Sequence, residues 1–129
     1  FNFGRIWLLS KNTEEEAKQV LEDKVRFPWS QTPDWFQKEA PITYKPALKA
    51  LFPRTRSYIL AVGENVADAE ARGTTASGII IDEAARQQKF GAILQACLPM
   101  ATKVIALTTA EIGNPGARLY KSLLESEAA

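Results

Sequence analysis

The chain has 129 residues, of which 46% are hydrophobic and 24% are charged. This size and composition are typical of one soluble globular domain and exclude a disordered or low-complexity chain. The sequence has no histidine and a single cysteine, which excludes histidine-based catalysis, a zinc site of Cys and His ligands, and an internal disulfide. The net charge of +1 gives no general indication of nucleic-acid binding.

The sequence carries neither a signal peptide nor an apolar run of roughly 18 residues, so we expect a cytoplasmic protein without membrane association. It opens with "FNFGRIWLLS", without a methionine and almost directly in an apolar strand pattern. This start indicates a piece of a longer protein.

The first half of the chain predicts one strand, one helix and an irregular connection. The apolar run Arg5–Ser10 predicts a short buried strand. Residues 12–27 predict a helix, because apolar residues recur at helical spacing and Thr13 with Glu16 has the pattern of a capping box. Residues 28–53 hold five of the seven prolines, so turns and short helices are expected there.

The second half predicts alternating strands and helices. A helix is expected within residues 84–100, closed by Pro99, and another from Pro115, with Asn114 as its cap. Three further strands are expected at residues 56–62, 77–83 and 103–109. Strands that alternate with helices predict an α/β fold with a mostly parallel sheet and flanking helices.

The pair Asp82 and Glu83 follows the apolar strand "GIII", and two interpretations of it stay open. Two acids after a strand can cap the next helix and favour its dipole. Alternatively, Asp82 holds a magnesium ion that bridges nucleotide phosphates, and Glu83 orients or polarises the attacking water. The second interpretation fits the place, because ligands of open α/β sheets bind at the carboxyl ends of strands.

A nucleotide site of this kind also needs a glycine-rich phosphate loop, G-x-x-x-x-G-K-[ST]. The sequence contains none. The nearest segment, "GARLYKS" at residues 116–122, has Lys121 in the place of the second glycine and predicts a helix. The chain therefore carries the hydrolytic half of a nucleotide site without the binding half.

Four blocks, in order, carry a family resemblance: "IWLLSKNTEEEAKQVLEDKVRF", "PDWFQ", "ARGTTASGIIIDEAAR" and "KVIALTTAEIGNPGARLYKSLL". Together they resemble the ATPase region of the large subunit of tailed-phage terminases, the DNA-packaging motors. The resemblance covers most of the chain and implies a P-loop NTPase-like fold of the additional-strand type, incomplete at its amino terminus. Residues 1–129 would then be a partial ATPase domain, and the nuclease domain of the family would lie outside them.

The resemblance also implies roles for five residues. Asp82 would be the Walker B ligand of magnesium, and Glu83 the catalytic glutamate. Thr108 and Thr109 resemble the coupling motif that links hydrolysis to DNA movement, although two threonines at a strand end can also satisfy their own backbone. Arg72 matches an arginine proposed to reach the nucleotide of a neighbouring subunit, and a loop-anchoring contact is the open alternative.

The implied function is ATP hydrolysis with magnesium, coupled to translocation of double-stranded DNA into a procapsid. The implied partners are the portal, the procapsid, the small terminase subunit and further copies in a ring, in the cytoplasm of a bacterial host. The alternative is a non-catalytic prophage remnant that acts as an interaction module. Without a phosphate loop, the 129-residue chain alone is expected to be inactive.

The resemblance has a structural consequence as well. In this fold class the strand that leads into the phosphate loop lies beside the strand of the coupling motif. Its absence leaves Val104–Leu107 at an open sheet edge, so we expect this strand to pair with another chain or to be covered by the amino-terminal segment.

Overall fold

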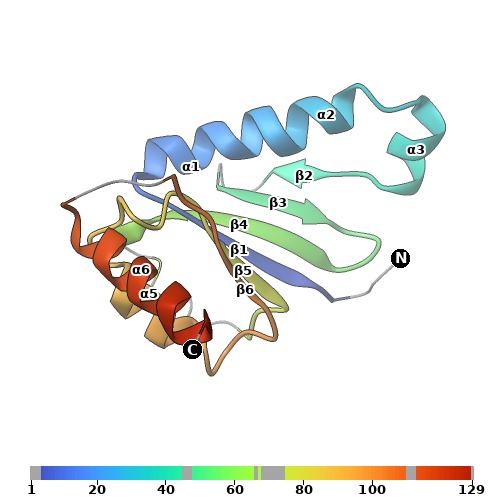
Figure 1. Ribbon diagram of the computed structural model, residues 1–129. Helices are drawn as coiled ribbons and strands as arrows, with labels where there is room; N and C mark the ends of the chain where they lie inside the picture. Colours follow the sequence, from blue (N-terminus) through green and yellow to red (C-terminus); the bar gives the residue numbers. More distant parts are fainter. Residues whose placement is uncertain (1–3, 45–47, 66, 68–74, 110–112, 129) are drawn as a thin grey trace.

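A computed structural model describes residues 4–44, 48–65, 67, 75–109 and 113–128 of the chain. It has an α/β fold in which helices flank both faces of one sheet (Figure 1). This architecture confirms the fold class expected from the alternating strands and helices. None of the helices in these ranges is long and apolar enough to cross a membrane.

The sheet has six strands in the order β2-β3-β4-β1-β5-β6. The central strand β1 pairs in parallel with β4 and with β5, and β5 pairs in parallel with β6. The other end of the sheet is antiparallel, from β4 through β3 to β2. The strands are β1 Ile6–Lys11, β2 Thr43–Tyr44, β3 Lys49–Phe52, β4 Ser57–Gly63, β5 Gly78–Ile81 and β6 Val104–Ala106.

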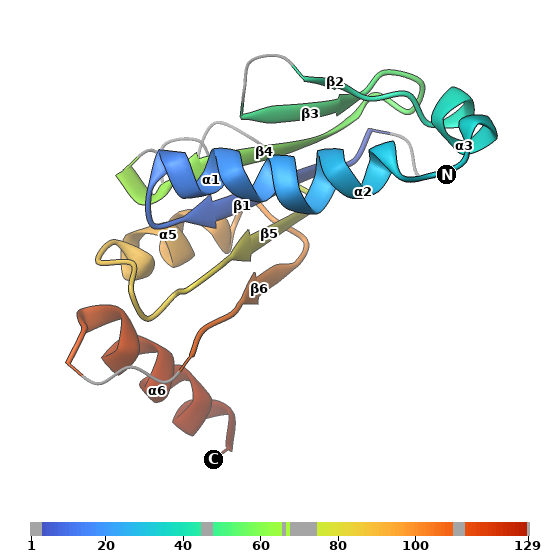
Figure 2. The same ribbon diagram turned by 90° about the horizontal axis from the view of Figure 1, so that it is seen from above.

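One face of the sheet is covered by a continuous helical run, formed by α1 Glu14–Leu21, the π-helical turn η1 Glu22–Arg26 and α2 Phe27–Ser30. The expected capping box is present: the amide of Glu16 donates to the Thr13 hydroxyl, and the amide of Thr13 donates to the Glu16 carboxylate. The run lies over β4 and β1 and leaves β5 and β6 uncovered on this face (Figure 2).

The opposite face is covered by α5 Phe90–Cys97 and α6 Pro115–Ala128, which begins where Asn114 and Pro115 predict. The sheet therefore separates two apolar clusters. The larger lies under α5 and α6 and includes Leu8, Ile79, Ile81, Phe90 and Ile93; the smaller lies under α1 and includes Ala17, Leu21, Ala50 and Ala61.

The helix expected within residues 84–100 is confirmed as α5, and residues 82–86 before it form turns. The expectation for the proline-rich connection 28–53 was wrong in detail. It contains not only the short helix α3 Asp34–Glu39 but also β2 and β3, which extend the sheet. Short strands such as β2 and β3 are stabilised by pairing with a neighbour, which local sequence does not reveal.

The strand β6 forms an edge of the sheet, as expected for Val104–Leu107. Lys103 and Leu107 use their backbone groups to bond β5, through Ile79 N to Lys103 O at 2.9 Å and Leu107 N to Ile81 O at 2.9 Å. Successive residues of a strand point their backbone groups to opposite sides. The amide of Val104 therefore faces away from β5, and within the described ranges no other strand pairs with this side.

We predict that the chain self-associates through this open edge, since unpaired strand groups template pairing with another chain. Val104→Pro removes one outward-facing N–H and no bond of the sheet itself, so it should weaken association while the fold is kept. Light scattering over a range of protein concentrations measures the mass. Val104→Ala is the control that keeps the N–H, and a wild-type mass independent of concentration would contradict the prediction.

Candidate functional site

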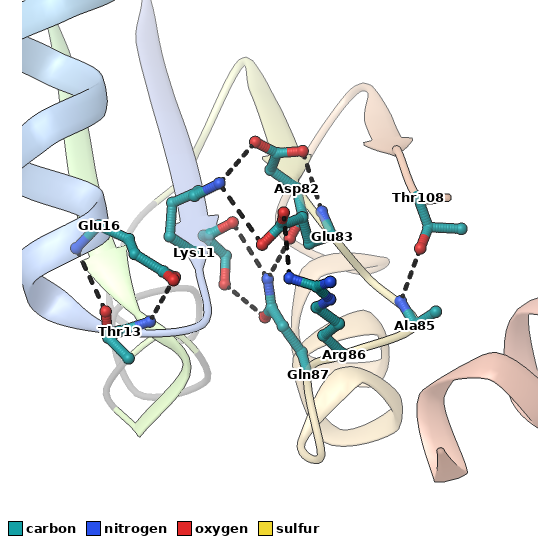
Figure 3. A network of polar contacts seen from close by, with 10 residues as sticks. Lys11, Thr13, Glu16, Asp82, Glu83, Ala85, Arg86, Gln87 and Thr108 are labelled. Carbon is teal, nitrogen blue, oxygen red and sulfur yellow. Dashed lines mark hydrogen bonds and ion pairs between the residues drawn. The ribbon is translucent and has the colours of Figure 1, made fainter. Parts of the chain in front are cut away.

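The candidate site lies where three parallel strands end at the same edge of the sheet. The strand β1 ends at Lys11, β5 is followed directly by Asp82, and β6 is followed by Leu107 and Thr108. Because the three strands are parallel, their carboxyl ends meet. Figure 3 shows the side chains of Lys11, Asp82 and Glu83 turned toward one another at this edge.

Asp82 and Glu83 stand in a turn and cap no helix among the described residues. The next helix, α5, begins at Phe90, and its cap residue Lys89 makes no side-chain capping bond. The Asp82 carboxylate instead accepts the amide of Glu83 at 2.9 Å through Oδ1. The helix-capping interpretation of this pair is therefore wrong, and the two carboxylates remain available for chemistry at the sheet edge.

The backbone of Glu83 is in the left-handed region, with φ of 52°. This conformation is uncommon for a residue with a side chain and costs roughly 1–2 kcal/mol. The strained turn aims the Glu83 carboxylate at the end of β1 (Figure 3). Backbone strain of this kind clusters at functional sites, where the surrounding structure maintains it.

Lys11 is a site residue that the sequence analysis missed. Its ammonium lies 2.9 Å from Asp82 Oδ2 and 3.8 Å from Glu83 Oε2. The residue is only 8% exposed, whereas the side chains of the two acids are each 34% exposed. Its position directly after a buried strand was the signal, because the end of β1 and the end of β5 lie side by side.

Gln87 ties these two strand ends together and was also missed. Its side chain is fully buried, at 0% exposure. Its amide nitrogen donates to the carbonyls of Ser10 at 3.1 Å and of Asp82 at 2.7 Å, and its amide oxygen accepts the Ser10 hydroxyl at 2.8 Å. Asp82 N adds a bond to Ser10 O at 3.0 Å. We call these four bonds between Ser10, Asp82 and Gln87 the Gln87 clamp.

Thr108 joins the same turn from the other side. Its hydroxyl accepts the amide of Ala85 at 3.2 Å and donates to the carbonyl of Thr109 at 3.0 Å. The carbonyl of Leu107 also accepts the amide of Ala84 at 2.9 Å. These bonds connect the end of β6 to the residues that follow Glu83. Thr109 is exposed and contributes its carbonyl to this arrangement.

Arg72, the fifth residue singled out from the sequence, lies outside the described residues. A different arginine is near the acids: Arg86 Nη1 lies 3.7 Å from Glu83 Oε1, and its side chain is 52% exposed. At this distance and exposure the pair contributes little to stability.

The first turn of α6 packs closely on the turn that follows the acids. A Cβ added at Gly116 would lie 2.5 Å from the carbonyl oxygen of Ala84 and 2.9 Å from those of Ala85 and Gln87. Only glycine allows this approach without a shift of backbone atoms. The helix α6, which follows Thr108 and Thr109 in the chain, is thus in direct contact with the turn that carries the carboxylates.

An open apolar groove of about 540 Å³ begins beside Asp82. It runs between the helical run and the strands β1 and β5, beside the part of the sheet that the helical run leaves uncovered (Figure 2), toward the end of β6. Leu107, which is 50% exposed, stands at one side of it. The groove is lined mainly by Trp7, Leu9, Val25, Ile59, Ile80 and Leu107.

The donor set fits a magnesium ion only in part. A carboxylate offers hard oxygens and about four lone-pair positions, so Asp82 can accept a metal beside its present partners. The described residues contain no group of three His, Cys, Asp or Glu side chains that could hold a metal by themselves. A site with one or two carboxylates is the kind that magnesium commonly uses, because it obtains its other ligands from phosphates and water.

The strain at Glu83 leads to a test by paired substitutions. Glu83→Gly and Glu83→Ala both remove the carboxylate, but only glycine relieves the left-handed backbone. The glycine variant should therefore have a free energy of unfolding higher by about 1 kcal/mol, measured by urea denaturation.

The same pair at Glu15, an exposed residue inside α1, is the control. There the order should reverse, because glycine costs about 1 kcal/mol relative to alanine in a helix. A Glu83→Ala variant as stable as Glu83→Gly would show that the left-handed backbone carries no strain.

A comparison with solved structures supports the fold. No family model matches the chain, and no curated protein matches it. Among solved structures, the chain is similar to the large terminase from a thermophilic bacteriophage, with a TM-score of 0.56 and 17% sequence identity. A structure of the same terminase in complex with ADP also has a TM-score of 0.56, with 14% identity.

The similarity covers 98% of this chain and 31% to 32% of the terminase chains. This chain thus spans about a third of the length of those proteins. At such low sequence identity, the similarity establishes a terminase-like fold for residues 1–129.

Proposed function

We propose that this chain is part of the ATPase motor of a viral DNA-packaging terminase large subunit. In that role it couples ATP hydrolysis to the translocation of double-stranded DNA into a procapsid. The observation that carries the proposal is the placement of Asp82 and the strained Glu83 at the end of the parallel strand β5, in a turn whose Ala85 amide donates to the Thr108 hydroxyl at the end of β6. The similarity to a terminase solved with ADP supports a nucleotide as the ligand.

Each residue of the site has a distinct part in this proposal. Asp82 binds magnesium, which neutralises charge on the transferred phosphate when it is bound. Glu83 accepts a proton from the attacking water or orients that water, and its strained backbone keeps the carboxylate aimed at the sheet edge. Thr108 passes a change at this turn to β6 and to α6, through its bond to Ala85 and the close contact at Gly116.

The remaining parts of the proposal come from the family resemblance. They are the partners of the motor, namely the portal, the procapsid, the small terminase subunit and neighbouring copies in a ring. A phosphate loop from a preceding segment of a longer protein would provide the amides and the lysine that this sequence lacks. Arg72 would act toward the nucleotide of the neighbouring subunit.

The test is made in the longer protein that the proposal implies. Glu83→Gln keeps the shape of the side chain but removes the base, so kcat for ATP hydrolysis should fall about 100-fold or more. Nucleotide affinity should stay within about threefold. ATP turnover and nucleotide binding are measured on the same preparations, with and without double-stranded DNA.

Glu39→Gln is the matched control, because Glu39 pairs with Arg54 away from the site, in a bond of 2.9 Å. It should leave turnover unchanged. Near-normal turnover of the Glu83→Gln variant would overturn the catalytic role of Glu83.

If the longer reading frame encodes no glycine-rich loop, the chain is instead a non-catalytic remnant that acts as an interaction module. The 129-residue chain itself should show no turnover above background.

A further inference from the structure

We propose that Lys11 is the internal counter-ion of the Asp82 and Glu83 pair and keeps free divalent cations off the site. This inference rests on the proposed function, since it assumes that Asp82 is the ligand of a divalent cation. It assigns a role in cation selectivity to a residue on β1, a strand that carries none of the motif residues.

The first argument is the geometry of the ammonium. Lys11 Nζ is 2.9 Å from Asp82 Oδ2 and 3.8 Å from Glu83 Oε2, so one cation faces both carboxylates. Oδ2 is the oxygen left after Oδ1 accepts the amide of Glu83. A metal ion that binds Asp82 through Oδ2 must either displace the ammonium or approach to within a few ångströms of it.

The second argument is that this placement is built into the backbone. Lys11 directly follows Ser10, and the Gln87 clamp joins Ser10 to the backbone of Asp82 through buried groups. The two strand ends cannot separate without breaking these bonds and leaving the buried Gln87 amide unpaired. The ammonium and the carboxylate can therefore part by rotation of a side chain, and not by separation of the two strands.

The third argument is that an open cavity lies beside Lys11, so that its side chain has space to move away from Asp82. Lys11 and Glu83 border an open cavity of about 230 Å³, which Glu16, Asp23 and Lys24 of the helical run also line. The two carboxyl groups outnumber the one further ammonium there, so a displaced Lys11 ammonium has room beside opposite charge.

The fourth argument concerns charge. Asp82 and Glu83 face Lys11, and Arg86 lies 3.7 Å from Glu83, so the four side chains carry no net charge and attract a free divalent cation only weakly to a partly exposed site. A cation that arrives with a polyphosphate brings negative charge of its own, so Lys11 opposes it less. Lys11 thus favours the cation–polyphosphate complex over the free ion.

The experiment measures Mn²⁺ affinity of the 129-residue chain by electron paramagnetic resonance of the free ion. Lys11→Met should bind Mn²⁺ about tenfold more tightly than the wild type, the order of magnitude for removing one charge from a partly solvated ion pair. Lys11→Arg keeps the charge and should stay within about twofold of the wild type. Lys18→Met is the control of equal charge change, because Lys18 pairs with Glu14 on the exposed face of α1.

A second readout is the shift of Tm on adding Mn²⁺, which grows with affinity for the folded state. It should be larger for Lys11→Met and for Lys11→Gln, which keeps a hydrogen-bond donor but no charge, than for the wild type. Neutral variants that fold only in the presence of Mn²⁺ would also support the proposal. Neutral variants with wild-type affinity, or variants that do not fold with or without Mn²⁺, would overturn it.

Asp82→Asn separates this inference from the proposed function. If Asp82→Asn abolishes Mn²⁺ binding and the neutral Lys11 variants bind as the wild type does, the cation site stands and only the role of Lys11 is rejected. If Mn²⁺ binding survives Asp82→Asn, the cation site of the proposed function is rejected together with the role of Lys11. If none of these proteins binds Mn²⁺, only the role of Lys11 is rejected, because the proposed function gives the metal phosphate ligands as well.

Discussion

The arrangement of the site depends on one buried side chain, that of Gln87. An amide buried in an apolar surrounding costs free energy unless its donors and acceptor are satisfied. The amide nitrogen of Gln87 donates to the carbonyls of Ser10 and Asp82, and its amide oxygen accepts the Ser10 hydroxyl. The same bonds fix the position of the end of β1 relative to the turn after β5. The position of Lys11, the bend at Glu83 and the contact with Thr108 all follow from that one fixed junction.

Much of the fold could be predicted from local sequence because its parallel strands are continuous apolar runs. The four runs recovered β1, β4, β5 and β6, with boundaries displaced by up to two residues at most ends and by three at the carboxyl end of β6. The strands β2 and β3 were not recovered. They have only two and four residues and lie between prolines, so they give no periodic signal. The helix α5 was recovered, because Phe90, Ile93, Leu94 and Cys97 recur at helical spacing before Pro99.

The part of the site that lies at the ends of predicted parallel strands could be predicted from the sequence. Asp82 and Thr108 follow apolar runs, so a parallel sheet brings them to one edge whatever the details. Lys11 also stands at the end of an apolar run, but the sequence does not show that β1 lies beside β5. Gln87 could not be assigned in this way, because it acts through Ser10, its partner 77 residues distant in sequence, and a lone glutamine there is indistinguishable from a surface residue. The strained backbone of Glu83 depends on the turn that residues 82–86 form in the folded chain, and no residue type at this position predicts it.

The central place of β1 bears on how the chain folds as it is made. Trp7 lies opposite Ile59 of β4 and opposite Gly78 of β5, so β1 is synthesised before partners that are 52 and 71 residues further along. Pairings at such separation form slowly, and until they do the apolar segment "IWLL" remains exposed. The parallel part of the sheet can therefore form only after β5 has left the ribosome, and until then the apolar side chains of β1 are open to contact with other chains.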